Sequence, residues 1–147
     1  IADLHALNVL DTPPEERFDR LTRAAAEHFG VPLSMVSLVD ADRQWWKAHH
    51  GTLDTGTPRD ISFCGHAILG TETFVVEDAY LDPRFVDNPL VTGDAKMRFY
   101  AGYPMKGPGG KNIGSFCIVD HKPRHMTPED IRTLEELGHQ AEVELAR

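Results

Sequence analysis

The stretch that decides the fold runs from Arg98 to Asp120, RFYAGYPMKGPGGKNIGSFCIVD. It contains two apolar runs rich in aromatic and β-branched residues, Phe99 to Met105 and Ile113 to Val119, joined by the Gly-rich linker Lys106 to Lys111. Two such runs around a short Gly- and Pro-containing linker predict a β-hairpin. A phosphate-binding loop would instead lead from a strand into a helix. Because this linker leads into a second strand and no Ser or Thr follows Lys111, the plain hairpin is the better interpretation.

Length and composition are those of one ordinary globular domain. Of the 147 residues, 41% are hydrophobic and 26% are charged, enough for one core. The formal net charge of -8 argues against a nucleic-acid surface. No apolar run is long enough to span a bilayer and no signal-peptide pattern opens the chain, so no membrane contact is expected. Two cysteines do not make a disulfide framework, and we expect a cytoplasmic protein.

Helical and extended patterns alternate along the rest of the chain. A helix is predicted from Pro14 or Glu15 to Phe29, because apolar residues recur at intervals of three and four until Gly30. A last helix is predicted from the N-cap Thr127 to Arg147. Three further strands are predicted at Leu33–Val39, Gln44–His49 and Phe74–Glu77.

The segments between these elements complete the predicted fold. The polar stretch Gly51 to Asp60 is predicted to be a loop, and Ser62 to cap a short helix from Phe63 to Leu69. The connection Asp78 to Lys96 is long for a compact domain, and such connections are commonly lids or binding segments. Because hairpins rather than helical crossovers join the strands, we expect an α+β fold with an antiparallel sheet. The end helices would cover one face of five strands, and the short helix with the long connection would cover the other.

Both ends of the chain carry helical patterns that have no obvious stop. Leu4, Leu7 and Leu10 suggest a helix that begins earlier, and the last helix reaches Arg147 without a C-cap glycine. We therefore expect one domain, residues 1–147, excised from a longer protein. The last helix carries an apolar stripe wide enough for both the sheet and a partner helix, and Gly138 would allow close approach. The stripe is Ile131, Leu134, Leu137, Ala141 and Leu145.

This order of elements, together with eight short strings, resembles the GAF domain family over essentially the whole chain. The strings are Leu10–Asp19, Val36–Asp40, Arg43–Lys47, Ser62–Ile68, Asp82–Phe85, Asn88–Val91, Arg98–Gly102 and Gly114–Asp120. They look like a subgroup found upstream of bacterial histidine kinases and diguanylate cyclases. One such string would carry little information, whereas eight in order are specific.

The resemblance implies a regulatory domain rather than an enzyme. It implies a sixth strand, a pocket on one face of the sheet, a homodimer through the terminal helices and an output signalling domain in the same chain, such as a histidine kinase or a cyclic-di-GMP enzyme. Family ligands include cyclic nucleotides, linear tetrapyrroles, haem and small metabolites. The family therefore defines a role more firmly than a ligand, which stays unknown.

Cys64 allows two interpretations. Near the N-terminus of a short helix its thiol pKa would be lowered, as a redox sensor needs. The neighbouring Phe63 and Ile68 favour instead a small buried hydrophobic side chain. In the related photoreceptors the cysteine that holds a tetrapyrrole is followed directly by histidine. Here Gly65 separates Cys64 from His66, which argues against a covalent chromophore.

Thiol enzymes and metal sites fit the sequence poorly. Free methionine sulfoxide reductases share the family fold and use several cysteines around the pocket, but residues 72–97 contain none. Cys117 lies deep in a predicted strand. One grouping of potential metal ligands can be named, namely His49, His50, Cys64 and His66. Strand alternation sends the first two to opposite faces, so no metal site is expected.

The candidate ligand-binding residues are those expected near the pocket. They are Trp45, Phe63, Cys64, His66, Asp78, Asn88, Arg98, Tyr100 and Phe116. Trp45 and Trp46 are expected on opposite faces, where one could stack on a flat ligand or simply pack in the core. Arg98, on the same face as Tyr100, could bind a ligand carboxylate or phosphate, or could pair with Asp78 and pin the long connection. Both interpretations of Arg98 stay open at this point.

Phe116 is the candidate that would match Tyr100 on the neighbouring strand, although the sequence does not fix the register. Three hypotheses for the function follow from these residues. The first is a small-molecule sensor that relays ligand state through its terminal helices. The second is a dimerisation scaffold whose pocket is filled by its own side chains. The third is a thiol-based redox sensor or an enzyme like the methionine sulfoxide reductases.

Overall fold

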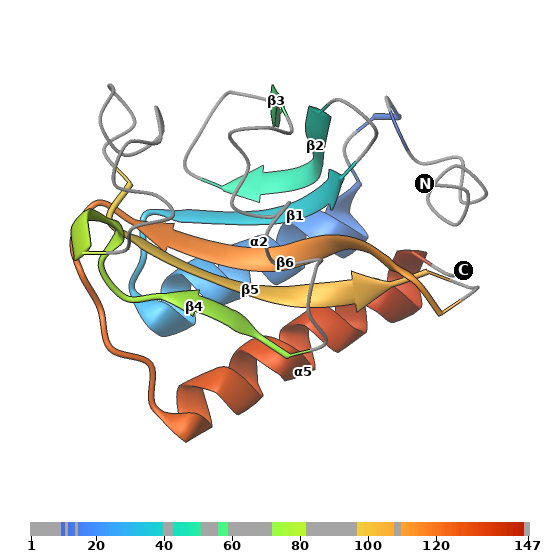
Figure 1. The fold of residues 1–147 in the computed structure, drawn as a ribbon. Helices are drawn as coiled ribbons and strands as arrows, with labels where there is room; N and C mark the ends of the chain where they lie inside the picture. Colours follow the sequence, from blue (N-terminus) through green and yellow to red (C-terminus); the bar gives the residue numbers. More distant parts are fainter. Residues whose placement is uncertain are drawn as a thin grey trace.

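Two long helices pack against one face of a six-stranded antiparallel sheet (Figure 1). The computed structural model describes residues 10, 12–13, 15–39, 43–50, 56–58, 72–81, 97–107 and 110–145. The strand order is β3-β2-β1-β6-β5-β4. The strands are β1 Leu33–Val39, β2 Arg43–His50, β3 Gly56–Pro58, β4 Phe74–Val76, β5 Phe99–Lys106 and β6 Asn112–Asp120. The helices are α2 Glu16–Phe29, α5 Pro128–Leu145 and the short 3-10 helix η2 Ala79–Leu81.

The predicted α+β fold is confirmed, with one correction in residues 51–60. This stretch, predicted to be a loop, contains β3, which pairs with the first three residues of β2. β3 lies at the edge of the sheet, where Pro58 does not have to donate a ladder hydrogen bond. The predicted helix at 63–69 lies outside the described residues, and of the connection 78–96 only the first residues, including η2, are described.

Buried side chains form one cluster on each face of the sheet. We call the side covered by α2 and α5 the helix face and the opposite side the second face. The helix-face core includes Phe18, Leu21, Val36, Leu38, Phe99, Ile113, Phe116, Leu134 and Ala141. The second-face cluster is Met35, Val39, Trp46, Val76, Ala79, Met97, Tyr100, Cys117 and Val119. The sheet is therefore buried on both sides, and any ligand site must compete with side-chain packing.

The ends of the helices are fixed by interactions that the sequence anticipates. Gly30 adopts the left-handed conformation (φ 65°) that ends α2. At the start of α5, Asp130 N–H donates to Thr127 Oγ1 at 3.1 Å and Thr127 N–H donates to Asp130 Oδ2 at 3.0 Å. This reciprocal pair is a capping box. In the described part of the chain, no helix has the length and apolar composition needed to cross a membrane.

Tyr103 of β5 fastens α5 to the sheet. Its ring lies where a side chain on Gly138 would be, since a Cβ there would come within 2.8 Å of Tyr103 Cγ. The phenol donates a hydrogen bond to Glu142, whose second oxygen accepts from Lys106 N–H at 3.0 Å. The close approach expected at Gly138 is thus made by a side chain of the sheet.

Replacing Gly138 with alanine should destabilise the domain by about 1–3 kcal/mol through overpacking. Glycine-to-alanine changes inside helices normally stabilise by about 1 kcal/mol, so the expected sign is reversed here. Urea unfolding followed by circular dichroism measures the difference. Gln140→Ala, at an exposed position of the same helix, is the control that should change little. A Gly138→Ala protein as stable as the original would contradict the packing described.

Tyr103 should also make stability depend on pH in the alkaline range. Burial, reinforced by the hydrogen bond to Glu142, raises the pKa of Tyr103 above its ordinary value of about 10. The native state holds the proton more tightly than the unfolded chain, so this contribution is complete below about pH 10 and is lost as the pH rises further. Tyr103→Phe should cost about 1 kcal/mol at pH 8. Urea titrations up to about pH 11 should show this difference shrinking; a constant difference would contradict the assignment.

Candidate functional site

A β-bulge in β2 decides which of its side chains share a face. Trp46 and Ala48 pair with consecutive residues of β1, so Lys47 is an extra residue. As a result Trp46 and His49, three positions apart, have their rings on the same side with centroids 6.5 Å apart. Trp45 and Ala48 pack with the helix-face core, whereas Trp46 packs in the second-face cluster. The prediction that the two tryptophans face opposite ways is confirmed.

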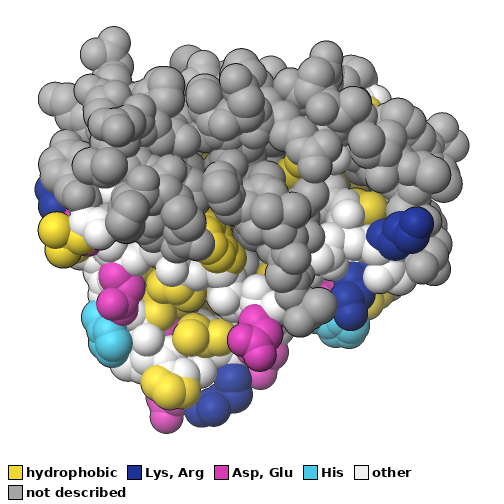
Figure 2. Space-filling view, in the orientation of Figure 1, with side chains coloured by type: hydrophobic (Ala, Val, Ile, Leu, Met, Phe, Trp, Pro, Cys, Tyr) yellow, Lys and Arg dark blue, Asp and Glu magenta, His cyan; other side chains and the backbone are white. Residues whose placement is uncertain are grey.

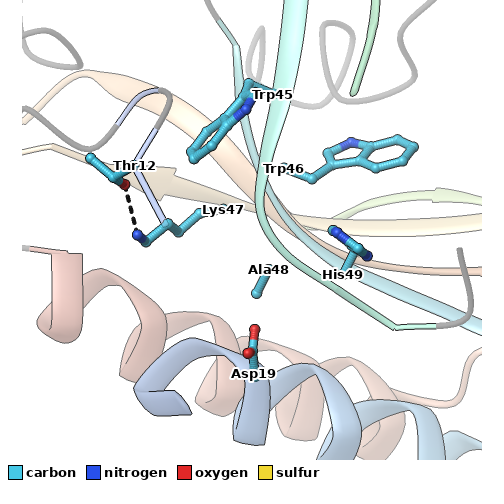
Figure 3. A pocket seen from close by; sticks show the side chains of 7 residues that line it. All are labelled: Thr12, Asp19, Trp45, Trp46, Lys47, Ala48 and His49. Carbon is cyan, nitrogen blue, oxygen red and sulfur yellow. Dashed lines mark hydrogen bonds between the residues drawn. The ribbon is translucent and has the colours of Figure 1, made fainter. Parts of the chain in front are cut away.

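A pocket of about 300 Å³ lies along β2, a volume at the lower end of the range for small-molecule sites. Figure 3 shows Trp46 and His49 on one side of the strand and Lys47 on the other, with Asp19 reaching up from α2 toward Ala48. The described residues lining the pocket are Thr12, Asp19, Trp45, Trp46, Lys47, Ala48 and His49. The lining residues therefore come from both faces of the sheet at β2.

Trp46, one of the residues that line this pocket, carries an unsatisfied hydrogen-bond donor. The residue is 9% exposed, and its indole nitrogen Nε1 is buried without a hydrogen-bond partner. The same is true of Ser34 Oγ and Thr73 Oγ1, but neither residue is among those lining the pocket. A buried donor without an acceptor costs about 1–3 kcal/mol. A molecule in the pocket that offers an oxygen to Trp46 would recover part of this cost.

Lys47, the next residue of the strand, is also buried, but its ammonium group has a full set of oxygen partners. Its side chain has no exposed surface, and its ammonium group lies 2.7 Å from each of three oxygens. They are Thr12 Oγ1, Pro13 O and Glu15 Oε2. The hydrogen bond from Lys47, with a second from Arg17, lowers the pKa of Glu15 below its usual range. Lys47 thus joins β2 to the segment that leads into α2.

Asp78 and Arg98 form a two-point ion pair at the ends of the long connection. Arg98 Nε donates to Asp78 Oδ1 at 2.9 Å and Arg98 Nη2 donates to Asp78 Oδ2 at 2.8 Å. Ala79 N–H also donates to Arg98 O at 2.6 Å. Of the two interpretations of Arg98, the structure contains the pairing with Asp78. Contact of either residue with a ligand stays a prediction.

Tyr100 lies on the second face, whereas Phe116 lies on the helix face. Tyr100 is 1% exposed, and its hydroxyl is 2.8 Å from Ser115 Oγ. The ring lies over Gly102, where a Cβ would come within 2.8 Å of Tyr100 Cζ. Phe116 pairs with Tyr103 and packs in the helix-face core, so the prediction that it faces the same side as Tyr100 is wrong. Cys117 takes that side of β6, because the register puts Phe116 opposite Tyr103.

Four predicted residues, Phe63, Cys64, His66 and Asn88, lie outside the described residues, and their role stays a prediction. Of the predicted ligand-binding residues, Trp45 lines the pocket. Trp46 and His49, which the sequence suggested as a stacking ring and a metal ligand, line it too, whereas the sequence did not single out Thr12, Asp19, Lys47 and Ala48. A lysine inside the aromatic strand Trp45-Trp46-Lys47 was the available signal for a polar site there. Within the described ranges, no group of three or more His, Cys, Asp or Glu side chains could hold a metal ion.

The strand order and the two helices on one face define an α+β domain with a candidate small-molecule pocket at β2. The GAF domain model matches residues 13–145. The chain therefore belongs to the GAF domain family.

Similar proteins span signalling and catalysis. The chain is 43% identical over 141 residues to a cyclic di-GMP phosphodiesterase of Pseudomonas aeruginosa, covering 96% of this chain and 24% of that protein, so it spans about a quarter of the relative's length. The GAF domain from an Acinetobacter phosphoenolpyruvate-protein phosphotransferase is similar in fold (TM-score 0.74, 16% identity, 98% and 90% of the two chains). So is the free methionine-R-sulfoxide reductase of Neisseria meningitidis (TM-score 0.69, 22% identity, 87% and 75%).

Burial should make Cys117 unreactive in the native protein. The residue is 0% exposed and its sulfur lies 3.7 Å from Met35 O, so a thiol reagent cannot reach it without unfolding. In a Cys64→Ser variant, where Cys117 is the one remaining cysteine, we expect no labelling by a chromogenic disulfide under native conditions. One equivalent should react in denaturant. Rapid native labelling would contradict the burial described.

Proposed function

We propose that this chain is the sensory domain of a bacterial signalling protein. It binds a small molecule and regulates an output domain in the same polypeptide. Family membership and the similarity to part of a cyclic di-GMP phosphodiesterase support this proposal. By this similarity the output domain is an enzyme of cyclic-di-GMP metabolism; a histidine kinase is the alternative. The domain acts in the cytoplasm.

The observation that carries the proposal is the unpaired N–H of Trp46, one of the residues that line the pocket. Buried polar groups are nearly always hydrogen-bonded, so an exception next to a pocket favours a ligand there. The ligand must bring an acceptor, such as a carbonyl, carboxylate or phosphate oxygen. The neighbouring rings of Trp46 and His49 favour a flat or unsaturated molecule.

The two competing functions fit the described residues less well. A reductase needs an accessible thiol, but Cys117 is buried and residues 72–97 contain no cysteine. A pure dimerisation scaffold needs an apolar surface, but the stripe of α5 is largely used inside the domain, where Leu134, Ala141 and Leu145 are buried. On the one face drawn in Figure 2, acidic, basic and histidine side chains of the described residues are interspersed with hydrophobic side chains. A homodimer through the terminal helices remains part of our proposal and would use the mostly polar outer faces of α2 and α5.

A thermal-shift screen of nucleotides, cyclic nucleotides and small carboxylic acids tests the proposal, because a ligand of the native state raises the melting temperature. A ligand that accepts from Trp46 should also change tryptophan fluorescence. Trp46→Phe keeps an aromatic ring but removes the donor, and should weaken binding about tenfold. Because this donor has no partner in the described structure, the variant should lose no hydrogen bond in the absence of ligand.

Tyr103→Phe, which also removes a hydrogen-bond donor from an aromatic ring but lies outside the residues that line the pocket, is the control and should bind normally. Binding that is equally weakened in both variants would place the ligand elsewhere. If no compound raises the melting temperature at millimolar concentration, small-molecule sensing by this pocket is contradicted.

A further inference from the structure

The contacts of Lys47 continue across the helix face to the end of α5. Glu15, which accepts from Lys47 through one carboxylate oxygen, accepts from Arg17 Nε through the other at 3.0 Å. Arg17 Nη1 in turn donates to the backbone carbonyl of Glu144 at 2.6 Å. The guanidinium group of Arg17 lies over the Phe18 ring, 4.6 Å from its centroid, which helps to fix its position. We call Lys47, Glu15, Arg17 and Glu144 the ionic chain.

The last member of the ionic chain lies in the last described turn of α5. There the carbonyl of Glu144 accepts the hydrogen bond from Arg17 Nη1. The Glu144 carboxylate lies 3.5 Å from Arg17 Nη1 and 3.8 Å from Arg20 Nη2. Both the backbone and the side chain at the end of α5 are thus held by cations of α2.

We propose that the ionic chain couples the β2 pocket to the position of the last described turn of α5. This regulatory role rests on the proposed function for its ligand, although the coupling itself is a property of the free domain. In one state Arg17 holds the last described turn of α5, and in the other state that turn is released from Arg17. A ligand changes their balance only if it favours one position of β2 over the other.

The tight contacts of the Lys47 ammonium with residues 12–15 would transmit a movement of β2 to these residues. Lys47 lies in the wall of the pocket and is directly bonded to Trp46. A fully buried ammonium cannot lose its partners without a large energetic cost. When β2 shifts, Thr12, Pro13 and Glu15 must therefore follow the ammonium group. Arg17 would move with Glu15, to which it is hydrogen-bonded, and Arg17 contacts Glu144 of α5 directly.

Hydrogen exchange at the last turn of α5 tests this coupling without any ligand. Glu15→Gln keeps the shape of the side chain, removes the charge shared by Lys47 and Arg17, and does not touch α5. We expect exchange of residues 142–145 to become about 5-fold faster, the order expected when one hydrogen bond to this turn is weakened. Arg17→Met should have at least the same effect. Arg23→Met breaks the exposed Arg23–Glu16 ion pair of the same helix and should leave residues 142–145 unchanged.

A double-mutant comparison links the pocket to the same readout. Trp46→Ala, which removes part of the pocket wall, should alter exchange at residues 142–145 in the original protein but not in the Arg17→Met background. If Glu15→Gln accelerates exchange only in residues 12–29, or equally throughout the domain, the ionic chain is a structural anchor and the proposal is overturned. Because no ligand is used, a failed ligand screen would overturn the proposed function and leave this result standing.

Discussion

The buried ammonium of Lys47 is the constraint on which the arrangement of sheet and helices depends. A charge with no exposed surface must be matched by nearby oxygens, and the three oxygens around it all come from residues 12–15. The β-bulge gives Lys47 its position on the helix face without displacing Ala48 from the core. The buried charge of Lys47 therefore accounts for three features together. They are the path of the chain into α2, the bulge in β2 and the position of the Phe18 ring beneath the ammonium group.

A second organising element is β5, which fastens both layers of the domain through two tyrosines. Tyr100 lies over Gly102 and reaches Ser115 on the second face. Tyr103, on the helix face, packs against Gly138 and donates to Glu142 of α5. Each ring occupies space that a side chain at a glycine would fill, so the close approach is made by the tyrosine and permitted by the glycine. β5 thus fixes the distance between the sheet and α5 through Tyr103, and it fills part of the second-face cluster through Tyr100.

Local signals predicted most of the fold, whereas the site depends on contacts between distant parts of the chain. The Gly30 stop and the Thr127 cap are encoded by neighbouring residues, and both are where the sequence placed them. The bulge at Lys47 has no comparable local signature, since its partners lie more than thirty positions earlier. Phe116 was assigned to the wrong face because alternation fixes faces only within one strand. The relative face of two strands depends on their register, which the hairpin loop alone did not reveal.

The contrast between adjacent residues of β2 is the strongest physical argument for a functional site. Lys47 has an acceptor for each of its donors, whereas Trp46 has none for its single donor. Trp46 packs in the second-face cluster, so its ring cannot turn toward another acceptor without disturbing that packing. The unpaired N–H therefore supports the proposal that a ligand supplies the missing acceptor.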